Sequence, residues 1–128
     1  MAATKSTFLA FLFVLGLLSL GCGREVCTGA GCICASGSCA YECDGAGCDY
    51  VCPAGTSCDN ACTDGRCQMQ CDDADSCVLD CPGNNCQMQC EGTATCRITG
   101  CTEGCQLQCG GAATCESSCT DSSCQTQR

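Results

Sequence analysis

The chain has 128 residues, of which 23 are cysteine and none is histidine or tryptophan. From Cys22 onward it carries four arginines against fourteen acidic residues, a net charge of −10 that disfavours nucleic acid and anionic membrane surfaces as partners. The same stretch holds only seven Val, Ile, Leu and Phe residues, too few to offset the entropy of ordering about a hundred residues. We therefore expect disulfides to supply the missing stability, as in small secreted domains.

The N-terminus has the pattern of an export signal. Lys5 precedes an apolar run from Phe8 to Leu20. A membrane-spanning helix needs about 20 apolar residues, so this run is too short to span and fits the apolar region of a secretory signal peptide. We predict a signal peptide over residues 1–21. The alternative, a buried core helix, has no downstream segment that could cover it.

The end of the apolar run, Leu18-Ser19-Leu20-Gly21-Cys22, resembles the lipobox of bacterial lipoproteins. The resemblance implies that Cys22 becomes the mature N-terminus and carries a lipid, and the absence of Asp at residue 23 suits outer-membrane sorting. Acyl chains would anchor the protein to a membrane without spanning it. Ordinary signal-peptidase cleavage beside Cys22 is the alternative. Acylation or removal of Cys22 leaves 22 cysteines, an even number that can form 11 disulfides.

A repeat organises the rest of the chain. Cys67-Gln-Met-Gln-Cys71 recurs as Cys86-Gln-Met-Gln-Cys90 and Cys105-Gln-Leu-Gln-Cys109, and a truncated copy starts at Cys124. The fixed period, about 19 residues, is typical of repeat architectures. The cysteines of residues 22–38 break the spacing, so we expect an anchor and an irregular segment there, followed by a cysteine-rich repeat domain over residues 39–128.

Each repeat contains two short Cys-x-x-x-Cys segments separated by turns rich in Gly, Pro, Asn, Asp and Ser. Cysteines four residues apart would share a helical face, but segments of five residues are too short for stable helices. In a strand, Cys67, Met69 and Cys71 point to one side and Gln68 and Gln70 to the other. We predict an all-β fold, a small disulfide-stapled β-solenoid with coils of about 19 residues. The alternative is an irregular disulfide-rich domain.

The repeat cysteines that are candidates for disulfides are expected to face the interior. They are Cys48, Cys52, Cys58, Cys62, Cys67, Cys71, Cys77, Cys81, Cys86, Cys90, Cys96, Cys101, Cys105, Cys109, Cys115 and Cys119. Bridged Cα atoms lie about 4.4–6.8 Å apart, so the two sheets must approach closely where they are joined. We expect bonds within each coil, from Cys71 to Cys77 and from Cys67 to Cys81, with equivalents in later coils. Bonds between coils are the alternative, because spacing alone does not fix connectivity.

Catalysis has few candidate residues in this sequence. The chain has no histidine and, after the predicted signal, no lysine, so acid–base and nucleophilic schemes lack their usual groups, and we expect neither an enzyme nor a cofactor. Metal binding by thiolates is the main alternative, because the composition resembles that of metallothioneins. Their Cys-x-Cys spacing occurs only once, at Cys32-Ile33-Cys34, so we expect no metal site. Asp72, Asp73 and Asp75 could hold Ca²⁺, but they lack EF-hand spacing and are expected to form a solvated turn.

The outward glutamines are expected to stack into two ladders along one flat face. They are Gln68, Gln70, Gln87, Gln89, Gln106, Gln108, Gln125 and Gln127. Amide ladders stabilise stacked strands, and the same face could bind a carbohydrate or protein partner. The layout is similar to that of insect antifreeze solenoids, although those use Thr arrays and a shorter period.

The Cys-x-x-x-Cys units, separated by turns of Gly, Thr and Asp, resemble the cysteine-rich repeat lipoproteins of predatory and social bacteria such as myxobacteria. The resemblance implies export and a stapled repeat domain, with no assigned activity. We expect a non-enzymatic, lipid-anchored protein of the cell envelope, at the outer membrane, that serves as a rigid structural or interaction module. The alternatives are a cysteine-rich metal-sequestering protein and a freely secreted, extracellular binding or effector protein.

Overall fold

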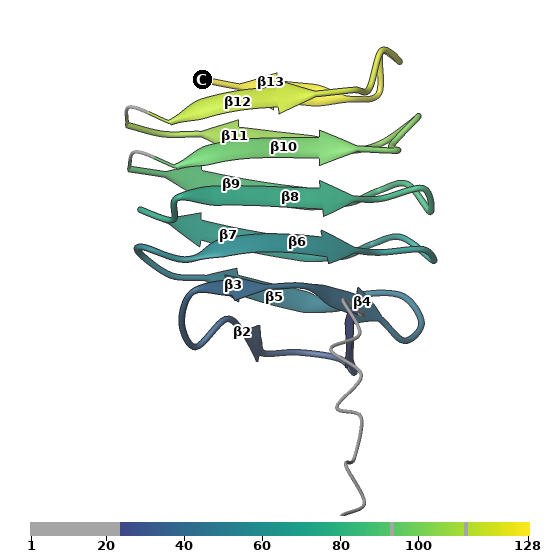
Figure 1. Cartoon of the computed structure of the whole chain (residues 1–128). Helices are drawn as coiled ribbons and strands as arrows, with labels where there is room; N and C mark the ends of the chain where they lie inside the picture. The colour runs from purple at the N-terminus through teal and green to yellow at the C-terminus, as the bar shows by residue number, and fades with distance from the viewer. Residues whose placement is uncertain (1–23, 93, 112) are drawn as a thin grey trace, which may run out of the picture.

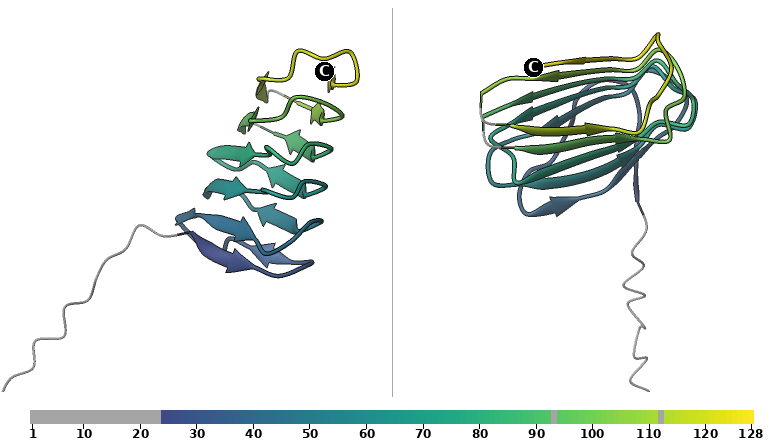
Figure 2. Two further views of the ribbon diagram at one scale, coloured as in Figure 1. Left: turned by 90° about the vertical axis from the view of Figure 1, so that its right-hand side faces the viewer. Right: turned by 90° about the horizontal axis from the view of Figure 1, so that it is seen from above.

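The computed structural model describes residues 24–92, 94–111 and 113–128, which form thirteen strands and no helix. The predicted signal peptide over residues 1–21 and the predicted lipid site, Cys22, lie outside the described residues. Except for β3 and β4, which belong to the same sheet, successive strands alternate between two parallel sheets, which face each other and are joined by turns at both edges (Figures 1 and 2). The predicted all-β solenoid is therefore confirmed.

The strands divide into a seven-stranded sheet, here called sheet A, and a six-stranded sheet, called sheet B. Sheet A contains β1 (Glu25–Cys27), β3 (Ser38–Cys39), β4 (Tyr41–Cys43), β6 (Ser57–Ala61), β8 (Ser76–Asp80), β10 (Thr95–Thr99) and β12 (Thr114–Ser117). Sheet B contains β2 (Cys32–Ile33), β5 (Asp49–Cys52), β7 (Gln68–Asp72), β9 (Gln87–Glu91), β11 (Gln106–Cys109) and β13 (Gln125–Gln127). Most neighbouring strands are offset by one repeat, so that Met69 lies beside Met88 and Leu79 beside Ile98.

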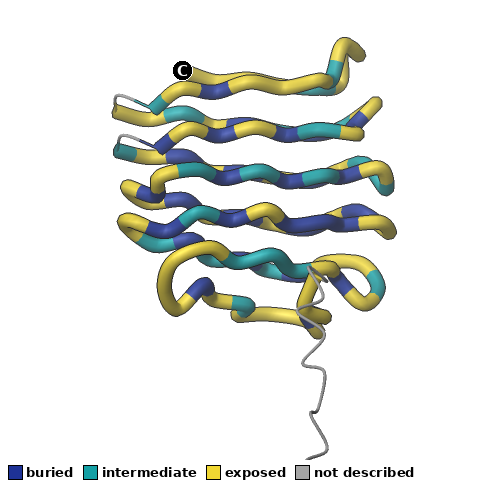
Figure 3. The backbone as a smooth tube through the Cα atoms, in the orientation of Figure 1, coloured by how far each residue is buried: buried dark blue, intermediate teal, exposed yellow. Residues whose placement is uncertain are grey.

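Buried and exposed residues alternate along most strands. One face of such a strand therefore packs in the interior and the other faces solvent, and one strand from each sheet makes up a regular coil. In β7 the residues Gln68, Gln70 and Asp72 are exposed while Met69 and Cys71 are buried. Between the flanking cysteines, most strands of the central coils contribute one large side chain to the interior. These side chains are Tyr50, Met69, Leu79, Met88, Ile98 and Leu107, each at most 1% exposed. Figure 3 shows the alternation of buried and exposed residues along successive coils.

One interior position on a strand carries an amide side chain. Asn60 is 1% exposed and lies beside Leu79 of the next coil, where an apolar residue would be expected. Its Oδ1 accepts a hydrogen bond of 3.0 Å from the backbone N–H of Tyr41, at the point where sheet A is interrupted between β3 and β4. The buried amide thus satisfies a backbone group at a break in the strand pairing.

Both sheets begin earlier than the predicted repeat boundary at residue 39. Strand β1 pairs with β4, and β2 pairs with β5, so part of the segment predicted to be irregular forms the first coil. Cys27 lies beside Cys43, which makes this coil shorter than the regular ones, where Cys58 lies beside Cys77. A search for one fixed period misses the shortened coil, which is why the segment looks irregular in the sequence.

Eleven disulfides close the turns, and each joins two cysteines that are consecutive in the chain. At one edge they are Cys27–Cys32, Cys43–Cys48, Cys62–Cys67, Cys81–Cys86, Cys101–Cys105 and Cys119–Cys124. At the other edge they are Cys34–Cys39, Cys52–Cys58, Cys71–Cys77, Cys90–Cys96 and Cys109–Cys115. All sixteen candidate cysteines are among them. The bridged Cα atoms lie from 5.6 to 6.6 Å apart, within the usual range for a disulfide.

The connectivity agrees with the sequence prediction at one edge and differs at the other. The expected Cys71–Cys77 bond is present, as are its equivalents in later coils. The expected Cys67–Cys81 bond is wrong, because Cys67 is bonded to Cys62 and Cys81 to Cys86. The short turn before β7 already holds the Cα atoms of Cys62 and Cys67 6.1 Å apart, so that pair closes without crossing a coil.

The entropy of loop closure does not explain why Cys67 is bonded to Cys62, which closes the shorter loop, and not to Cys81. A loop of about six residues is worth roughly 2 kcal/mol in the chain-entropy model, whereas a loop of about 15 residues is worth roughly 3 kcal/mol. The Cys62–Cys67 bond is therefore favoured by the local geometry of the turn, although it constrains the unfolded chain less than a bond across the coil would.

Candidate binding face

Sheet B presents two columns of glutamine side chains to solvent. The first column is Gln68, Gln87, Gln106 and Gln125, and the second is Gln70, Gln89, Gln108 and Gln127. Their register is unbroken from β7 to β13, so equivalent residues in neighbouring strands lie about 4.8 Å apart. The two ladders expected from the sequence are present.

The interior neighbours of the glutamines hold them in this outward position. Gln70 lies between Met69, which is 1% exposed, and Cys71, which is 2% exposed. Because side chains alternate along a strand, burial of these two residues turns the amide between them toward solvent. The ladders end toward the N-terminus at β5, where Asp49 and Val51 occupy the two positions.

A shallow groove follows the second glutamine column. One hollow of about 160 Å³ is lined by Gln70, Cys71, Asp72, Gln89 and Glu91. A second hollow of about 270 Å³ is lined by Gln89, Cys90, Glu91, Gln108, Cys109, Gly110, Gln127 and Arg128. The hollows share Gln89 and Glu91, so together they form one groove along the stack, which we call the glutamine groove. The first glutamine column lines neither hollow.

One wall of the glutamine groove carries acidic side chains along β7 and β9 and has no side chain at the next coil. Asp72 and Glu91 are in register, one residue beyond the cysteines that end the repeated segment. The next equivalent residue is Gly110, where a Cβ would meet the Glu91 side chain at an ordinary contact distance of 3.6 Å. Arg128 lies at the far end of the groove. The groove therefore offers amide donors and acceptors along its length, carboxylate acceptors on one wall and a guanidinium donor at one end.

The outer face of sheet A carries a column that the sequence pattern alone did not bring out. Ser38, Ser57, Ser76, Thr95 and Thr114 are in register and form a column of hydroxyl groups. The signal in the sequence was a Ser-Cys or Thr-Cys dipeptide that recurs every 19 residues from Ser38 to Thr114. The neighbouring column mixes Asp59, Val78, Arg97 and Glu116, of which Arg97 and Glu116 form an exposed ion pair. Sheet A thus has no second uniform column among its described residues.

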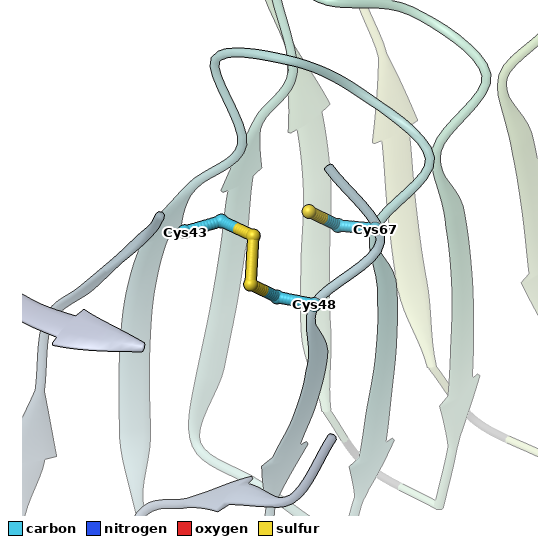
Figure 4. Close-up of side chains that lie close together, drawn as sticks. All are labelled: Cys43, Cys48 and Cys67. Atoms are coloured by element: carbon cyan, nitrogen blue, oxygen red, sulfur yellow. A yellow bond between two sulfur atoms is a disulfide. The ribbon is translucent and has the colours of Figure 1, made fainter. Parts of the chain in front are cut away.

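Sulfur atoms converge at the edges of the solenoid in a way that bears on metal binding. The Sγ atoms of Cys43, Cys48 and Cys67 lie within 4.8 Å of one another, and Figure 4 shows Cys67 beside the Cys43–Cys48 disulfide. Cys67 is itself bonded to Cys62. In the part of the chain that the structure describes, the side chains that gather in this way are all cysteines, and all of them are in disulfides. Such sulfurs are not thiolates and lack the charge that a metal site requires.

The candidate calcium turn lies between β7 and β8. Asp72, Asp73 and Asp75 are all exposed, and the only buried residue of the turn is Ala74. The geometry is that of a solvated turn anchored by one small apolar side chain.

Two described groups have displaced pKa values. Burial raises the pKa of Tyr50 to about 12, with a smaller opposing effect from Arg24 and a smaller raising effect from Glu42. The Tyr50 hydroxyl donates a hydrogen bond of 2.8 Å to the backbone oxygen of Ala61. Hydrogen bonds from the hydroxyl and the backbone N–H of Ser123 lower the pKa of the Asp121 carboxyl. Neither group lines the glutamine groove, so these shifts concern stability and local turn structure.

No helix within the described residues is long and apolar enough to cross a bilayer. No protein-family model matches the chain, and comparison with curated proteins and with solved structures finds no match. Its function must therefore be inferred from the geometry of the molecule.

Proposed function

We propose that this protein is a non-enzymatic, lipid-anchored protein of the cell envelope that serves as a rigid interaction module. The observation that carries the proposal is the closure of each turn between the sheets by its own disulfide, which fixes a polar, periodic face on a molecule with few aliphatic residues. Extensive disulfide bonding is consistent with an exported, non-cytoplasmic protein.

The position of the first coil supports an anchor at Cys22. Strand β1 begins at Glu25, shortly after Cys22, and it lies at the N-terminal end of the stack (Figure 1). A lipid on Cys22 would hold this end near the membrane, and the remaining coils would project from it. The two large apolar side chains exposed among the described residues, Val26 and Ile33, belong to this same first coil, at 69% and 56% exposure. They lie at the end of the stack that a lipid on Cys22 would hold near the membrane.

Metal sequestration is less well supported by the geometry. The 22 cysteines from Cys27 to Cys124 are paired in eleven disulfides, which leaves no thiolate among the described residues to bind a soft metal ion. Resemblance to the cysteine-rich repeat lipoproteins of myxobacteria is in accord with the proposed envelope protein.

The anchor is tested by metabolic labelling with palmitate in a bacterium that processes lipoproteins. The full chain should incorporate label and fractionate with the envelope, and Cys22→Ala should lose the label and release the protein. The matched control is the double variant Cys27→Ala/Cys32→Ala, which removes one disulfide and leaves the lipobox unchanged, so it should remain labelled. Unlabelled full chain recovered from the medium would instead favour the freely secreted alternative.

A further inference from the structure

We infer that the glutamine groove binds an extended, neutral β-1,4-linked polysaccharide lying along the axis of the stack, one sugar to each coil. This inference rests on the proposed interaction module and names its partner. The groove runs across β7, β9, β11 and β13 and repeats the same amide side chain at each strand: Gln70, Gln89, Gln108 and Gln127. A partner that uses all four must be a polymer with a matching repeat.

The distance between successive glutamines of the groove determines which kind of polymer can match it. Neighbouring strands lie about 4.8 Å apart, so the four glutamines span about 14 Å. One sugar of an extended β-1,4-linked glycan advances its chain by about one such step. An extended polypeptide advances about 3.3–3.4 Å per residue, so neither one nor two of its residues match a rung. Successive sugars of such a glycan are turned over relative to each other, so sugars two coils apart present the same face to the groove, while every sugar lies beside one glutamine.

The charges around the groove exclude polyanions. Asp72 and Glu91 lie on its wall, Arg128 is its one cationic residue, and the chain from Cys22 onward has four arginines against fourteen acidic residues. Nucleic acids and acidic glycans would be repelled by this surface. Neutral sugar hydroxyls can instead donate to the carboxylates and pair with both ends of each amide.

The groove recognises its partner by hydrogen bonds alone. The aromatic residues of the described chain are Tyr41 in β4 of sheet A and Tyr50 in the interior, so neither provides a stacking surface in the groove. A solvent-exposed hydrogen bond contributes little net free energy, so one sugar should bind very weakly. Affinity should rise with each added sugar and level off once the four rungs are filled.

The two glutamine columns provide a matched control for this inference. Gln68 and Gln87 share strands, sheet face and residue type with Gln70 and Gln89, but they line neither hollow. A binding site in the groove predicts that only the second column contributes. A general effect of surface amides predicts that both columns contribute equally.

The experiment uses the full-length oxidised protein purified in detergent and titrated with neutral β-1,4-linked glucose oligosaccharides of one to six units. We expect affinity to rise about fivefold per sugar up to four units and then to level off. Gln70→Thr/Gln89→Thr should weaken binding of the tetramer at least tenfold, and Gln68→Thr/Gln87→Thr should change it less than twofold. Gly110→Leu, which fills the open wall without adding an aromatic ring, should also abolish binding, and it tests the groove without removing an amide.

The inference is overturned if the tetramer binds no better than the single sugar, if both glutamine columns contribute equally, or if an extended neutral peptide binds as well as the glycan. Thiol counting on each variant establishes that its disulfides are intact before binding is measured. Since the titration is independent of the lipid, failure to bind with normal palmitate labelling would remove the groove assignment and leave the proposed envelope module standing.

Discussion

Tyr50 fills the interior position that Met69, Met88 and Leu107 fill in later coils. It differs from them in carrying a hydroxyl, whose hydrogen bond to the Ala61 backbone oxygen lets a polar atom be buried without loss. Such a group favours the neutral phenol, because ionisation would place a charge in the interior. The interior of the solenoid is therefore sensitive to alkaline pH at this residue.

We predict that Tyr50 ionises near pH 12 in the folded protein and near its ordinary value of 10 in the unfolded chain. Its contribution to the free energy of unfolding is then fully present below pH 10 and is lost as the pH rises toward 12. Tyrosinate absorbance during rapid alkaline titration should show this late ionisation, and Tyr50→Phe should remove it while Tyr41→Phe retains it. Ionisation of Tyr50 near pH 10 in the folded protein would contradict its burial.

The turns from sheet A to sheet B stack as closely as the strands do. Gly47 donates its backbone N–H to the oxygen of Gly65 at 3.1 Å, and Arg66 donates to the oxygen of Asn84 at 3.0 Å. Gly65 has a φ of +80°, and a Cβ at this position would collide with the backbone of Gly83 in the next coil. Glycine is therefore required here both by the backbone conformation and by the contact between coils.

We predict that Gly65→Ala lowers the free energy of unfolding by about 2 kcal/mol more than Gly45→Ala does. Gly45 also has a positive φ, of +97°, but a Cβ there would meet nothing within 4 Å. The control should thus show only the backbone cost of about 1–2 kcal/mol. Denaturant unfolding with the disulfides intact measures both, and equal losses would mean that the turns do not stack as described.

The strand faces and the disulfides at the edge of Cys71 and Cys77 could be predicted from the sequence, whereas the partners at the edge of Cys62 and Cys67 could not. Alternation along Gln-Met-Gln determines which side chains point inward, and a fixed period determines which residues lie side by side. Cys62 and Cys81 lie at the same edge of the coils as Cys67, so either could be its disulfide partner. The spacing of the cysteines in the sequence does not show which of the two the turn brings closer to Cys67. The glutamine groove could not be predicted either, because the two glutamine columns have the same pattern in the sequence. Only in the structure does the second column lie beside a wall that Asp72 begins and that is open at Gly110.

At the scale of the whole molecule, the disulfides take over the stabilising role of a large aliphatic interior. Each small loop contributes roughly 2 kcal/mol in the chain-entropy model, and the interior adds only about one large side chain per strand. The bonds differ in access: Cys62 and Cys67 are fully buried, whereas Cys119 and Cys124 of the last coil are partly exposed. Among the described disulfides, Cys119–Cys124 is the one in which both cysteines are partly exposed, so reduction should begin there.

We predict that limiting phosphine reductant at acidic pH opens Cys119–Cys124 before Cys62–Cys67, and that full reduction removes the strand signal in far-ultraviolet circular dichroism. Alkylation and peptide mass analysis identify the opened bonds, and the native protein should show no free thiol from Cys27 onward. The matched control is the same protein carried through the procedure without reductant. A fully reduced chain that keeps its strand signal would refute the role given to the disulfides.

The pairing of consecutive cysteines has a consequence for how such a chain can change in length during evolution. Because each bond closes inside a single turn, duplication or deletion of one repeat unit in the regular part of the chain leaves every thiol with a neighbour to oxidise with. A recombination event would lengthen or shorten the solenoid by one coil, and each glutamine column by one residue. Genomes that carry relatives of this protein should then encode solenoids of different lengths, all with an even number of cysteines in the repeat region.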